Sequence, residues 1–304
     1  MKEKCESPRP NNMSETLIIL NPAARSERAQ AAWEKIDSLV HGRAKVVSTT
    51  EPGEARRLAA HAAAHGTKIV VAAGGDGTIN EIVNGLAGSK TALGILPVGT
   101  MNVFAAELAV PKSLREAWKV ISAGHTREID LVRANRHYFV QLAGVGLDAQ
   151  VVKETSWSSK RTFGPLSYLY STAQIAARKP PEIFAETGEG RTIAGSFMLI
   201  GNGRFYGGPI EFFKKAQVDD GLLDVLVFKK MGHLDLARYF ANIVMGRHTR
   251  LSDVEYFQTR KVHIHSKESV PVEVDGELAT ELPVTFRISS KKLRVVVPKE
   301  MAPA

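Results

Sequence analysis

The sequence is poor in cysteine and has no long apolar run, and each absence excludes a class of protein. Cys5 is the single cysteine among 304 residues, so no intrachain disulfide can form and a reducing compartment is expected. No stretch approaches the ~20 apolar residues that a membrane-spanning helix needs. The opening residues, MKEKCESPRPNNMSE, lack the apolar core of a signal peptide. We therefore expect a cytoplasmic protein that does not cross a membrane but can contact one.

Several common ligand-binding motifs are also missing. There is no G-x-x-x-x-G-K-[ST], which excludes a P-loop, and GVG at 144–146 lacks the third glycine of a dinucleotide fingerprint. The nine histidines show no H-E-x-x-H spacing, so we expect no zinc centre. No helix-turn-helix or RNP pattern accompanies the net charge of +8, so we expect no nucleic acid partner.

The composition that remains is that of a folded protein with an anionic partner. Hydrophobic residues make up 44% and charged residues 24%, which excludes a collagenous, disordered or disulfide-built chain. At roughly 100 to 200 residues per domain, the length favours two domains. Residues 1–130 carry 16 basic and 14 acidic side chains, and residues 131–304 carry 24 and 18. The positive excess is therefore mainly C-terminal.

The first half of the chain alternates apolar runs with Ala- and Leu-rich segments of helical spacing. This pattern predicts a parallel, doubly wound sheet, because strands joined by helices pair in parallel. The strands are expected at 16–20, 45–48, 68–73 and 92–97, and the helices at 26–40, 53–65, 78–86 and 114–123.

The second half contains short β-rich runs between turns and predicts a β-sandwich. The runs lie at 193–200, 222–228, 261–266, 270–274, 284–288 and 293–297, and two helices are expected at 167–179 and 234–245. We therefore predict an α/β domain over 14–133 and a β-sandwich domain over 134–300. The final strand is a candidate to return to the first domain.

The motif Gly74-Gly75-Asp76-Gly77-Thr78 stands where an apolar strand ends and a helix begins. Glycines let backbone N–H groups approach phosphate oxygens, and the helix N-terminus adds partial positive charge. The motif therefore predicts a phosphate cradle. Thr78 and Glu81 also form a capping-box pattern, which would explain both residues without a ligand.

A second turn, LPVGTMN at 96–102, follows the next predicted strand. Open α/β sheets bind ligands at the carboxyl ends of their strands, so two such turns side by side predict a cleft.

At this point the sequence resembles a known family. GGDGTINEIVNGL followed by LPVGTMNVFA is similar to the catalytic domain shared by diacylglycerol kinases, sphingosine kinases and bacterial soluble lipid kinases. GNG at 201–203, DDGLLD at 219–224 and DGE at 275–277 extend the resemblance over most of the chain. The resemblance implies that ATP binds with Mg²⁺ in a cleft between an α/β domain and a β-sandwich.

The resemblance also implies a set of site residues. The positions that it places at the nucleotide are Asn21, Thr49, Gly74, Gly75, Asp76, Gly77, Thr78, Ile79, Asn80, Glu81, Gly99, Thr100 and Asn102. Glu277 matches the base that takes the lipid hydroxyl proton in the bacterial branch, whereas Asp76 matches the proposed base of the sphingosine kinase branch. Asp130 matches an acidic position that organises water and Mg²⁺. A plain β-turn is the alternative interpretation of Asp-Gly-Glu.

A structural metal site is implied at DDGLLD. Asp220 would join backbone oxygens of Gln217 and Leu222 around an oxygen-seeking cation. A polar turn before the next strand is the alternative. The chain departs from the family where Val103 replaces a frequent aspartate.

The expected function is an ATP- and Mg²⁺-dependent lipid kinase that phosphorylates a hydroxyl of a diacylglycerol-like or sphingoid lipid in the membrane. The C-terminal positive charge predicts peripheral contact with an anionic membrane surface. A soluble kinase such as NAD kinase and a nucleotide- or lipid-binding regulator without catalysis are the alternatives. The sequence leaves a homodimer open.

Overall fold

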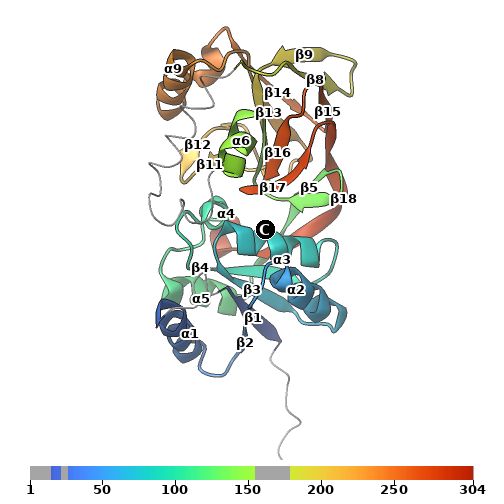
Figure 1. The fold of residues 1–304 in the computed structure, drawn as a ribbon. Coiled ribbons are helices and arrows are strands. Elements are labelled where there is room, and N and C mark those ends of the chain that lie inside the picture. The colour runs from blue at the N-terminus through green and yellow to red at the C-terminus, as the bar shows by residue number, and fades with distance from the viewer. Residues whose placement is uncertain (1–14, 22–26, 155–178, 304) are drawn as a thin grey trace, which may run out of the picture.

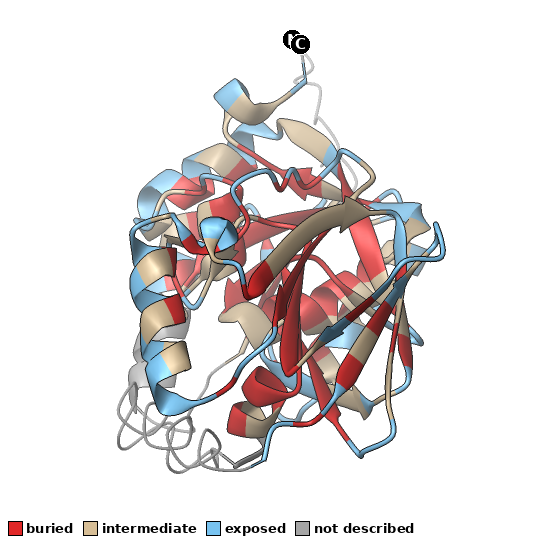
Figure 2. Cartoon of the chain, turned by 90° about the horizontal axis from the view of Figure 1, so that it is seen from above, coloured by how far each residue is buried: buried red, intermediate tan, exposed pale blue. Residues whose placement is uncertain are grey.

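The computed structural model describes residues 15–21, 27–154 and 179–303, which form two lobes (Figure 1). The helix expected over 167–179 lies outside these residues apart from its last position. Figure 2 shows that buried residues concentrate in the central strands, while the outward surfaces of the helices are exposed.

The N-terminal lobe is built on a parallel sheet, as the alternation predicts. Its strands, in spatial order, are β2 (Lys45–Ser48), β1 (Thr16–Leu20), β3 (Ile69–Gly74) and β4 (Ala92–Pro97). Nearly every residue of β3 and β4 is buried, which is typical of parallel strands covered on both faces. The α/β fold class is confirmed.

Helices cover this sheet in two pairs. Helix α2 (Glu54–Ala64) packs on α3 (Asp76–Leu86), and α1 (Glu27–Val40) contacts α5 (Leu114–Ala123). A short helix, α4 (Val103–Glu107), follows β4. The predicted phosphate motif therefore lies between the end of β3 and the start of α3.

One long strand carries the sheet into the second lobe. β18 (Val284–Val296) pairs in parallel with β4 and antiparallel with β5 (Thr126–Ala134) and β15 (Lys261–Ser266). Two separate strands were expected here, at 284–288 and 293–297. The structure joins them through an irregularity between Ile288 and Lys292. The final strand therefore does pair with the first lobe.

The second lobe packs the far end of this sheet against a six-stranded antiparallel sheet. The order of the second sheet is β14 (Val254–Thr259), β13 (Leu223–Phe228), β10 (Phe197–Gly201), β7 (Leu142–Val145), β16 (Pro271–Val274) and β17 (Glu277–Glu281). β8 (Ile183–Thr187) and β9 (Thr192–Gly195) complete the first sheet beyond β15, and β6 (His137–Phe139) pairs with β5. The sandwich prediction is confirmed.

The prediction of a single strand over 193–200 is wrong in one respect. The chain leaves the first sheet after Gly195 and enters the second at Phe197, so the run is divided into β9 and β10. Between them, the Ser196 N–H donates to the Phe228 carbonyl at 2.8 Å and its hydroxyl to the Lys229 carbonyl at 3.0 Å. These bonds hold the crossing point against β13.

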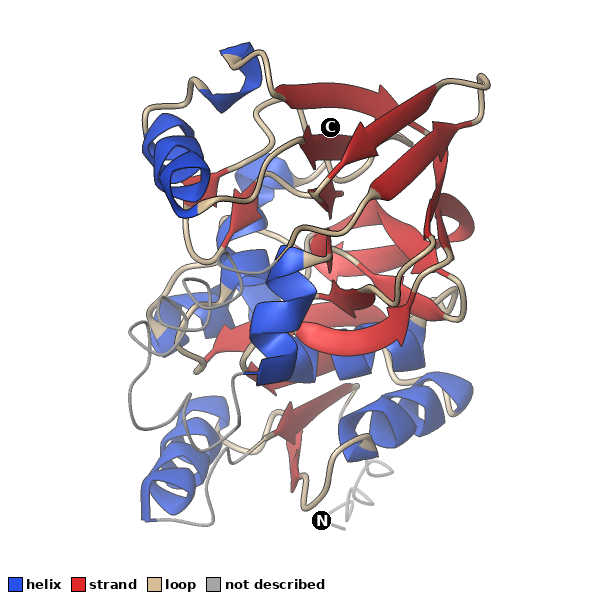
Figure 3. Cartoon of the chain, turned by 45° about the horizontal axis from the view of Figure 1, so that its top comes forward, coloured by secondary structure: helices blue, strands red, loops and turns tan. Residues whose placement is uncertain are grey.

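Helices flank the strands of the second lobe (Figure 3). The remaining elements of this lobe are α6 (Leu147–Glu154), β11 (Phe205–Tyr206), β12 (Ile210–Glu211), α9 (His233–Val244) and a 3₁₀ turn (His248–Arg250). A second 3₁₀ turn, Lys299–Met301, follows β18, and Met301 packs on the core of the N-terminal lobe. The helix expected over 234–245 is confirmed as α9. Among the described residues, no helix is both long enough and apolar enough to cross a bilayer.

Candidate functional site

The loop between β3 and α3 is a tight glycine turn. A Cβ built on Gly74 would lie 2.5 Å from the Thr78 hydroxyl oxygen, so only glycine fits there. α3 begins at Asp76, and its N-cap, Gly75, provides no side-chain hydrogen bond. The capping-box interpretation of Thr78 and Glu81 is therefore wrong, because no side chain caps α3. The first N–H groups of α3 remain suited to an anion.

The strand ends beside this turn bring two further predicted residues together. The Asn21 side-chain amide donates to the Thr78 hydroxyl at 2.9 Å, and its main-chain N–H donates to the Ala73 carbonyl at 3.0 Å. Thr49 is buried at the end of β2, where its N–H donates to the Leu20 carbonyl at 2.9 Å. The three strands thus place Asn21, Thr49 and Thr78 at the carboxyl edge of the sheet, as expected.

The second glycine turn packs directly on the first. A Cβ on Gly99 would come 2.5 Å from the Gly75 Cα, so the two backbones touch. Asn102 holds this turn, because its Oδ1 accepts from the Gly99 N–H at 3.0 Å and its Nδ2 donates to the Gly99 carbonyl at 2.7 Å. Thr100 is exposed at the tip. The two glycine turns are therefore adjacent, as the predicted cradle requires, and phosphate binding there stays a prediction.

Asp76 joins the cradle to α4. Its Oδ1 accepts from the Phe104 N–H at 3.4 Å. Burial raises the pKa of Asp76, while hydrogen bonds from the backbone at Phe104 and Val103 act in the opposite direction. Backbone amides and a single carboxylate beside a phosphate cradle fit a nucleotide with a divalent cation, which commonly uses one or two carboxylates plus phosphate oxygens.

Glu277 reaches this cradle from the other lobe. Asp275 and Gly276 both have positive φ angles, 47° and 86°, and form the turn between β16 and β17. A Cβ built on Gly77 would come 2.7 Å from the Glu277 Oε1. The β-turn interpretation of Asp-Gly-Glu is thus correct for the backbone, and the turn places the Glu277 carboxylate against the first turn of α3.

Asp275 locks the turn in this position, a role the sequence reasoning did not assign. Its carboxylate accepts four hydrogen bonds, from the N–H groups of Val140, Gln141 and Leu142 and from the Asn80 amide at 2.9 Å. Burial raises the pKa of Asp275, and these hydrogen bonds oppose the rise. Asn80 therefore ties α3 to the turn. Its side-chain amide is engaged in a hydrogen bond within the protein.

Two other predicted nucleotide residues have structural tasks. The Glu81 carboxylate accepts from the N–H groups of Gly53 at 2.9 Å and Ala55 at 3.1 Å, so it caps the start of α2. The Ile79 side chain is buried in the core of the N-terminal lobe. Any nucleotide contact by Ile79 is therefore limited to its main chain.

A buried carboxyl pair supports the same turn from behind. The Glu273 Oε2 accepts from the Gly276 N–H at 2.7 Å. A Cβ on Gly144 would come 2.8 Å from the Glu273 Oε1 and 2.5 Å from the Asp148 Oδ2, so the two acids face each other there. The pKa of Glu273 is raised well above its ordinary value, mainly by burial and secondly by the nearby Asp148 carboxylate. Glu273 lies within an apolar strand, and sequence reasoning missed it.

Asp130 lies at the junction of the lobes and is completely buried on β5. It forms an ion pair with Lys292 of β18, and its Oδ2 accepts from the Gly221 N–H at 2.8 Å. Both carboxylate oxygens thus have protein partners in the loop and strand around them. A role for Asp130 toward water and Mg²⁺ stays a prediction.

The predicted metal residues share one tight turn. The Asp220 Oδ1 accepts from the Leu222 N–H at 2.9 Å, and the Asp220 N–H donates to the Gln217 carbonyl at 3.4 Å. Partial burial, followed by the charges of Asp130 and Asp219, raises the pKa of Asp220. No group of three or more His, Cys, Asp or Glu side chains suited to a metal occurs in the described ranges. A site of one carboxylate and backbone oxygens stays a prediction.

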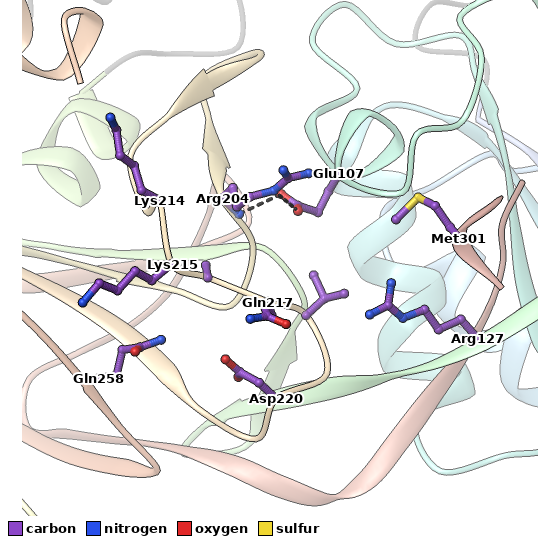
Figure 4. Close-up of a pocket in the computed structure, with 11 residues that line it drawn as sticks. Glu107, Arg127, Arg204, Lys214, Lys215, Gln217, Asp220, Gln258 and Met301 are labelled. Atoms are coloured by element: carbon purple, nitrogen blue, oxygen red, sulfur yellow. Dashed lines mark hydrogen bonds and ion pairs between the residues drawn. The ribbon is translucent and has the colours of Figure 1, made fainter. Parts of the chain in front are cut away.

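This turn borders a pocket of about 590 Å³ between the lobes (Figure 4). Gln217 and Asp220 line it together with four cationic side chains, Arg127, Arg204, Lys214 and Lys215. Two of these cations are paired within the protein. The Arg204 Nε donates to the Glu107 Oε1 at 3.0 Å, and Arg127 bonds Asp219. The residues lining the pocket do not include the two glycine turns.

Both lobes match known protein families. The model of the diacylglycerol kinase catalytic domain matches residues 15–134, and that of the YegS C-terminal NAD kinase beta sandwich-like domain matches 141–297. A diacylglycerol kinase of Bacillus subtilis (strain 168) is 32% identical over 262 residues, which cover 84% of this chain and 86% of that protein. A diacylglycerol kinase of Staphylococcus aureus (strain bovine RF122 / ET3-1) is 28% identical over 293 residues, with 93% and 92% covered.

The fold has a counterpart among solved structures. A crystal structure of a diacylglycerol kinase from Bacillus anthracis strain Sterne matches with a TM-score of 0.73 at 21% identity, covering 96% of this chain and all of that one. The matched domains include both glycine turns, the Asp-Gly-Glu turn and the two lobes that carry them. The chain therefore belongs to the diacylglycerol kinase catalytic-domain family, a family of lipid kinases, in the form that carries a YegS-type C-terminal domain.

Proposed function

We propose that this protein transfers the γ-phosphate of ATP to the hydroxyl of diacylglycerol or a related lipid at a membrane surface. The observation that carries the proposal is the contact of the Glu277 carboxylate with Gly77, at the helix terminus that would hold the phosphates. Residues 14–133 would bind the nucleotide and residues 134–300 the lipid. The names of the relatives support diacylglycerol as the first substrate to test.

The N-terminal lobe would hold the phosphates. The N–H groups at the start of α3 have no side-chain cap, so they can donate to phosphate oxygens, and the helix dipole favours negative charge there. The contact between Gly75 and Gly99 keeps both turns free of side chains where a triphosphate would approach. Mg²⁺ bound beside Asp76 would neutralise charge on the phosphoryl group that is transferred.

Glu277 would act as the general base. A lipid hydroxyl loses its proton late in phosphoryl transfer, so a carboxylate of ordinary basicity suffices if it lies within hydrogen-bond distance. Asp275 would hold the turn that orients Glu277, through its bonds to the backbone at 140–142 and to Asn80. Asp76 faces the start of α4 instead, which favours a role near the cation over a role as base.

The test is transfer of labelled γ-phosphate to dioleoylglycerol in mixed micelles. We expect Glu277→Gln to lower kcat by about 100-fold or more, within the range for loss of a general base, while ATP affinity stays within a few-fold. Glu281→Gln, the same chemical change at the other end of β17, is the matched control. Full activity of Glu277→Gln would remove Glu277 from the mechanism.

Assays on the same purified protein distinguish the proposal from two alternative functions. The C-terminal domain model is described as NAD kinase beta sandwich-like, so NAD is assayed as an acceptor beside the lipid. Phosphorylation of NAD without phosphorylation of lipid would replace the proposal by a soluble kinase. ATP binding without turnover on any lipid of a panel would favour a non-catalytic regulator.

A further inference from the structure

Helix α9 exposes a continuous apolar face at the edge of the second lobe. Leu234 is 87% exposed, Phe240 58%, Val244 63% and Met245 55%. Their spacing places them on one side of the helix, together with the exposed Ala237 and Ala241. An exposed cluster of large apolar side chains is uncommon on a soluble surface and marks an interaction site.

The opposite side of α9 is anchored firmly. Tyr239 and Ile243 are buried, and the Tyr239 ring packs with Phe197 and Phe228. The Tyr239 hydroxyl donates to the Asp253 Oδ2 at 2.9 Å, and Arg238 pairs with the same carboxylate. The inward side of the helix is therefore committed to the core, and the apolar face is the outward one.

The two charged side chains of α9 are paired within the protein. Asp235 is the acidic residue of the helix, and it pairs with Arg238 at 3.1 Å. Arg238 also bonds Asp253, so its charge at the margin of the apolar face is balanced by two carboxylates.

Basic residues stand at both ends of the apolar face. Lys229 and Lys230 precede the helix, and Arg247 and Arg250 follow it, so residues 229–250 carry five basic and one acidic side chain. Lys230, Arg247 and Arg250 are exposed and make no ion pair within the described part of the chain. The Lys214 ammonium, on a neighbouring loop, lies against Gly246. The face is thus apolar along its length and cationic at its rim.

We propose that this α9 face docks the protein on an anionic lipid surface. Leu234, Phe240, Val244 and Met245 would enter the boundary between headgroups and acyl chains, and the basic rim would contact the headgroups. A helix lying in the interface binds through this combination of buried apolar area and attraction to anionic lipid. The inference rests on the proposed function and names the surface through which it operates.

A second copy of the chain fits this face less well. A dimer built on two α9 faces would bring two basic rims together, and like charges across an interface oppose association. An anionic bilayer complements both the apolar face and its rim. Figure 1 shows α9 at the outer end of the second lobe, where its outward side is open to such a surface.

The docking test compares vesicle binding of three forms of the full chain. In the first variant, Leu234→Glu and Phe240→Glu are combined, and the control combines Ala60→Glu and Ala64→Glu on the exposed side of α2 in the other lobe. Sedimentation is measured with vesicles of phosphatidylcholine and 30% phosphatidylglycerol, and with phosphatidylcholine alone. We expect the α9 variant to lose at least about tenfold in partition to the anionic vesicles, and the control to bind like the parent.

A second arm tests the rim. Lys230→Glu combined with Arg247→Glu should weaken binding to the anionic vesicles and flatten its dependence on salt. The proposal is overturned if either variant, Leu234→Glu with Phe240→Glu or Lys230→Glu with Arg247→Glu, binds anionic vesicles as well as the parent does. A parent dimer that the Leu234→Glu and Phe240→Glu variant dissociates, with no change in vesicle binding, would overturn it in favour of a second copy.

Activity on a monomeric substrate separates this inference from the function it rests on. With dihexanoylglycerol below its micellar concentration and no vesicles present, the α9 variant should phosphorylate substrate at the parent rate. If the parent itself has no lipid kinase activity, the proposed function fails, while the vesicle arms still decide the docking surface. If the α9 variant loses activity on the monomeric lipid as well, the face serves the active site, and docking as the sole role is overturned.

Discussion

Glu277 and Gly77 lie in contact although they belong to opposite lobes. A Cβ on Gly77 would come 2.7 Å from the Glu277 Oε1. Gly77 is within α3, with a φ angle outside the left-handed region, so its missing side chain is explained by this neighbour and not by backbone strain. The space that glycine leaves is the space that the carboxylate occupies.

Gly77→Ala should therefore separate activity from stability. The added methyl group would displace the end of a flexible side chain, and alanine favours a helix over glycine by up to about 1 kcal/mol. We expect kcat to fall by about tenfold or more, with an unchanged or slightly higher melting temperature. Steady-state kinetics and calorimetry on the same preparation measure both quantities.

Gly85→Ala supplies the contrast on the same helix. Its Cβ would meet the Arg56 carbonyl oxygen at 2.5 Å, which is backbone and cannot move freely. This variant should lose stability instead, by about 1 to 3 kcal/mol for an overpacked contact. Equal effects of Gly77→Ala and Gly85→Ala on stability would contradict our account of the Gly77 contact.

Gly99→Ala should weaken nucleotide binding. The methyl group would come 2.5 Å from the Gly75 Cα and force the two glycine turns apart. We expect the Kd for ATP, measured by isothermal titration, to rise by about tenfold, which corresponds to about 1.4 kcal/mol. Gly188→Ala is the control, because no atom lies within 4 Å of its added Cβ. An unchanged Kd in Gly99→Ala would show that the turns bind no phosphate.

Asp275→Asn should disturb the turn that carries Glu277. Each carboxylate oxygen of Asp275 accepts two of the four hydrogen bonds. An amide keeps one acceptor oxygen and places an NH₂ group against the two donors of the other, so two of the four hydrogen bonds are lost. We expect a loss of about 1 to 3 kcal/mol in the free energy of unfolding, together with reduced kcat. Urea denaturation and the micelle assay measure these effects. A stable variant with normal kcat would show that Asp275 does not position Glu277.

Glu273→Gln should make stability less dependent on pH. The pKa of Glu273 is raised in the folded protein, so the folded state binds this proton more tightly than the unfolded chain does. Its stabilising contribution is complete below the ordinary pKa of 4.5 and is lost as pH rises through the raised value. The parent should therefore lose stability from about pH 4.5 upward, and the amide should remove that loss.

Urea denaturation between pH 4 and pH 9 tests this expectation. The variant should gain on the parent as pH rises, because glutamine can accept from the Gly276 N–H and donate to Asp148 without ionising. Glu281→Gln, an exposed change of the same kind, should follow the pH profile of the parent. Parallel profiles for the parent and Glu273→Gln would contradict a proton held by this carboxyl pair.

The sequence predicted most of the N-terminal lobe because its signals are local. The apolar runs of β3 and β4 are buried on both faces, so their pattern is strong. β5, by contrast, was not expected, because TREIDLVRA carries charged residues at its start and only its partners in the sheet reveal it as a strand. The run over 193–200 reads as one strand, although the chain changes sheets at Ser196.

The hydrogen-bond partners of side chains were less predictable than the helices and strands. Thr78 and Glu81 match a capping pattern four residues long, yet Thr78 accepts from Asn21 and Glu81 caps α2. Spacing along one helix cannot report a partner from another element. For the same reason, Asp275 was recognised only as part of a turn, and Glu273 was not recognised at all.

By itself, the sequence determined the alternation of strands and helices in the N-terminal lobe, the glycine turns and the residue types that phosphate chemistry needs, since these depend on neighbours a few positions apart. Only the tertiary structure decided that Glu277 meets Gly77, that Asp275 and Asn80 join the lobes, and that α9 presents its apolar side outward. Those relationships depend on long-range strand pairing and packing, which bring together residues that carry no signal of each other along the chain.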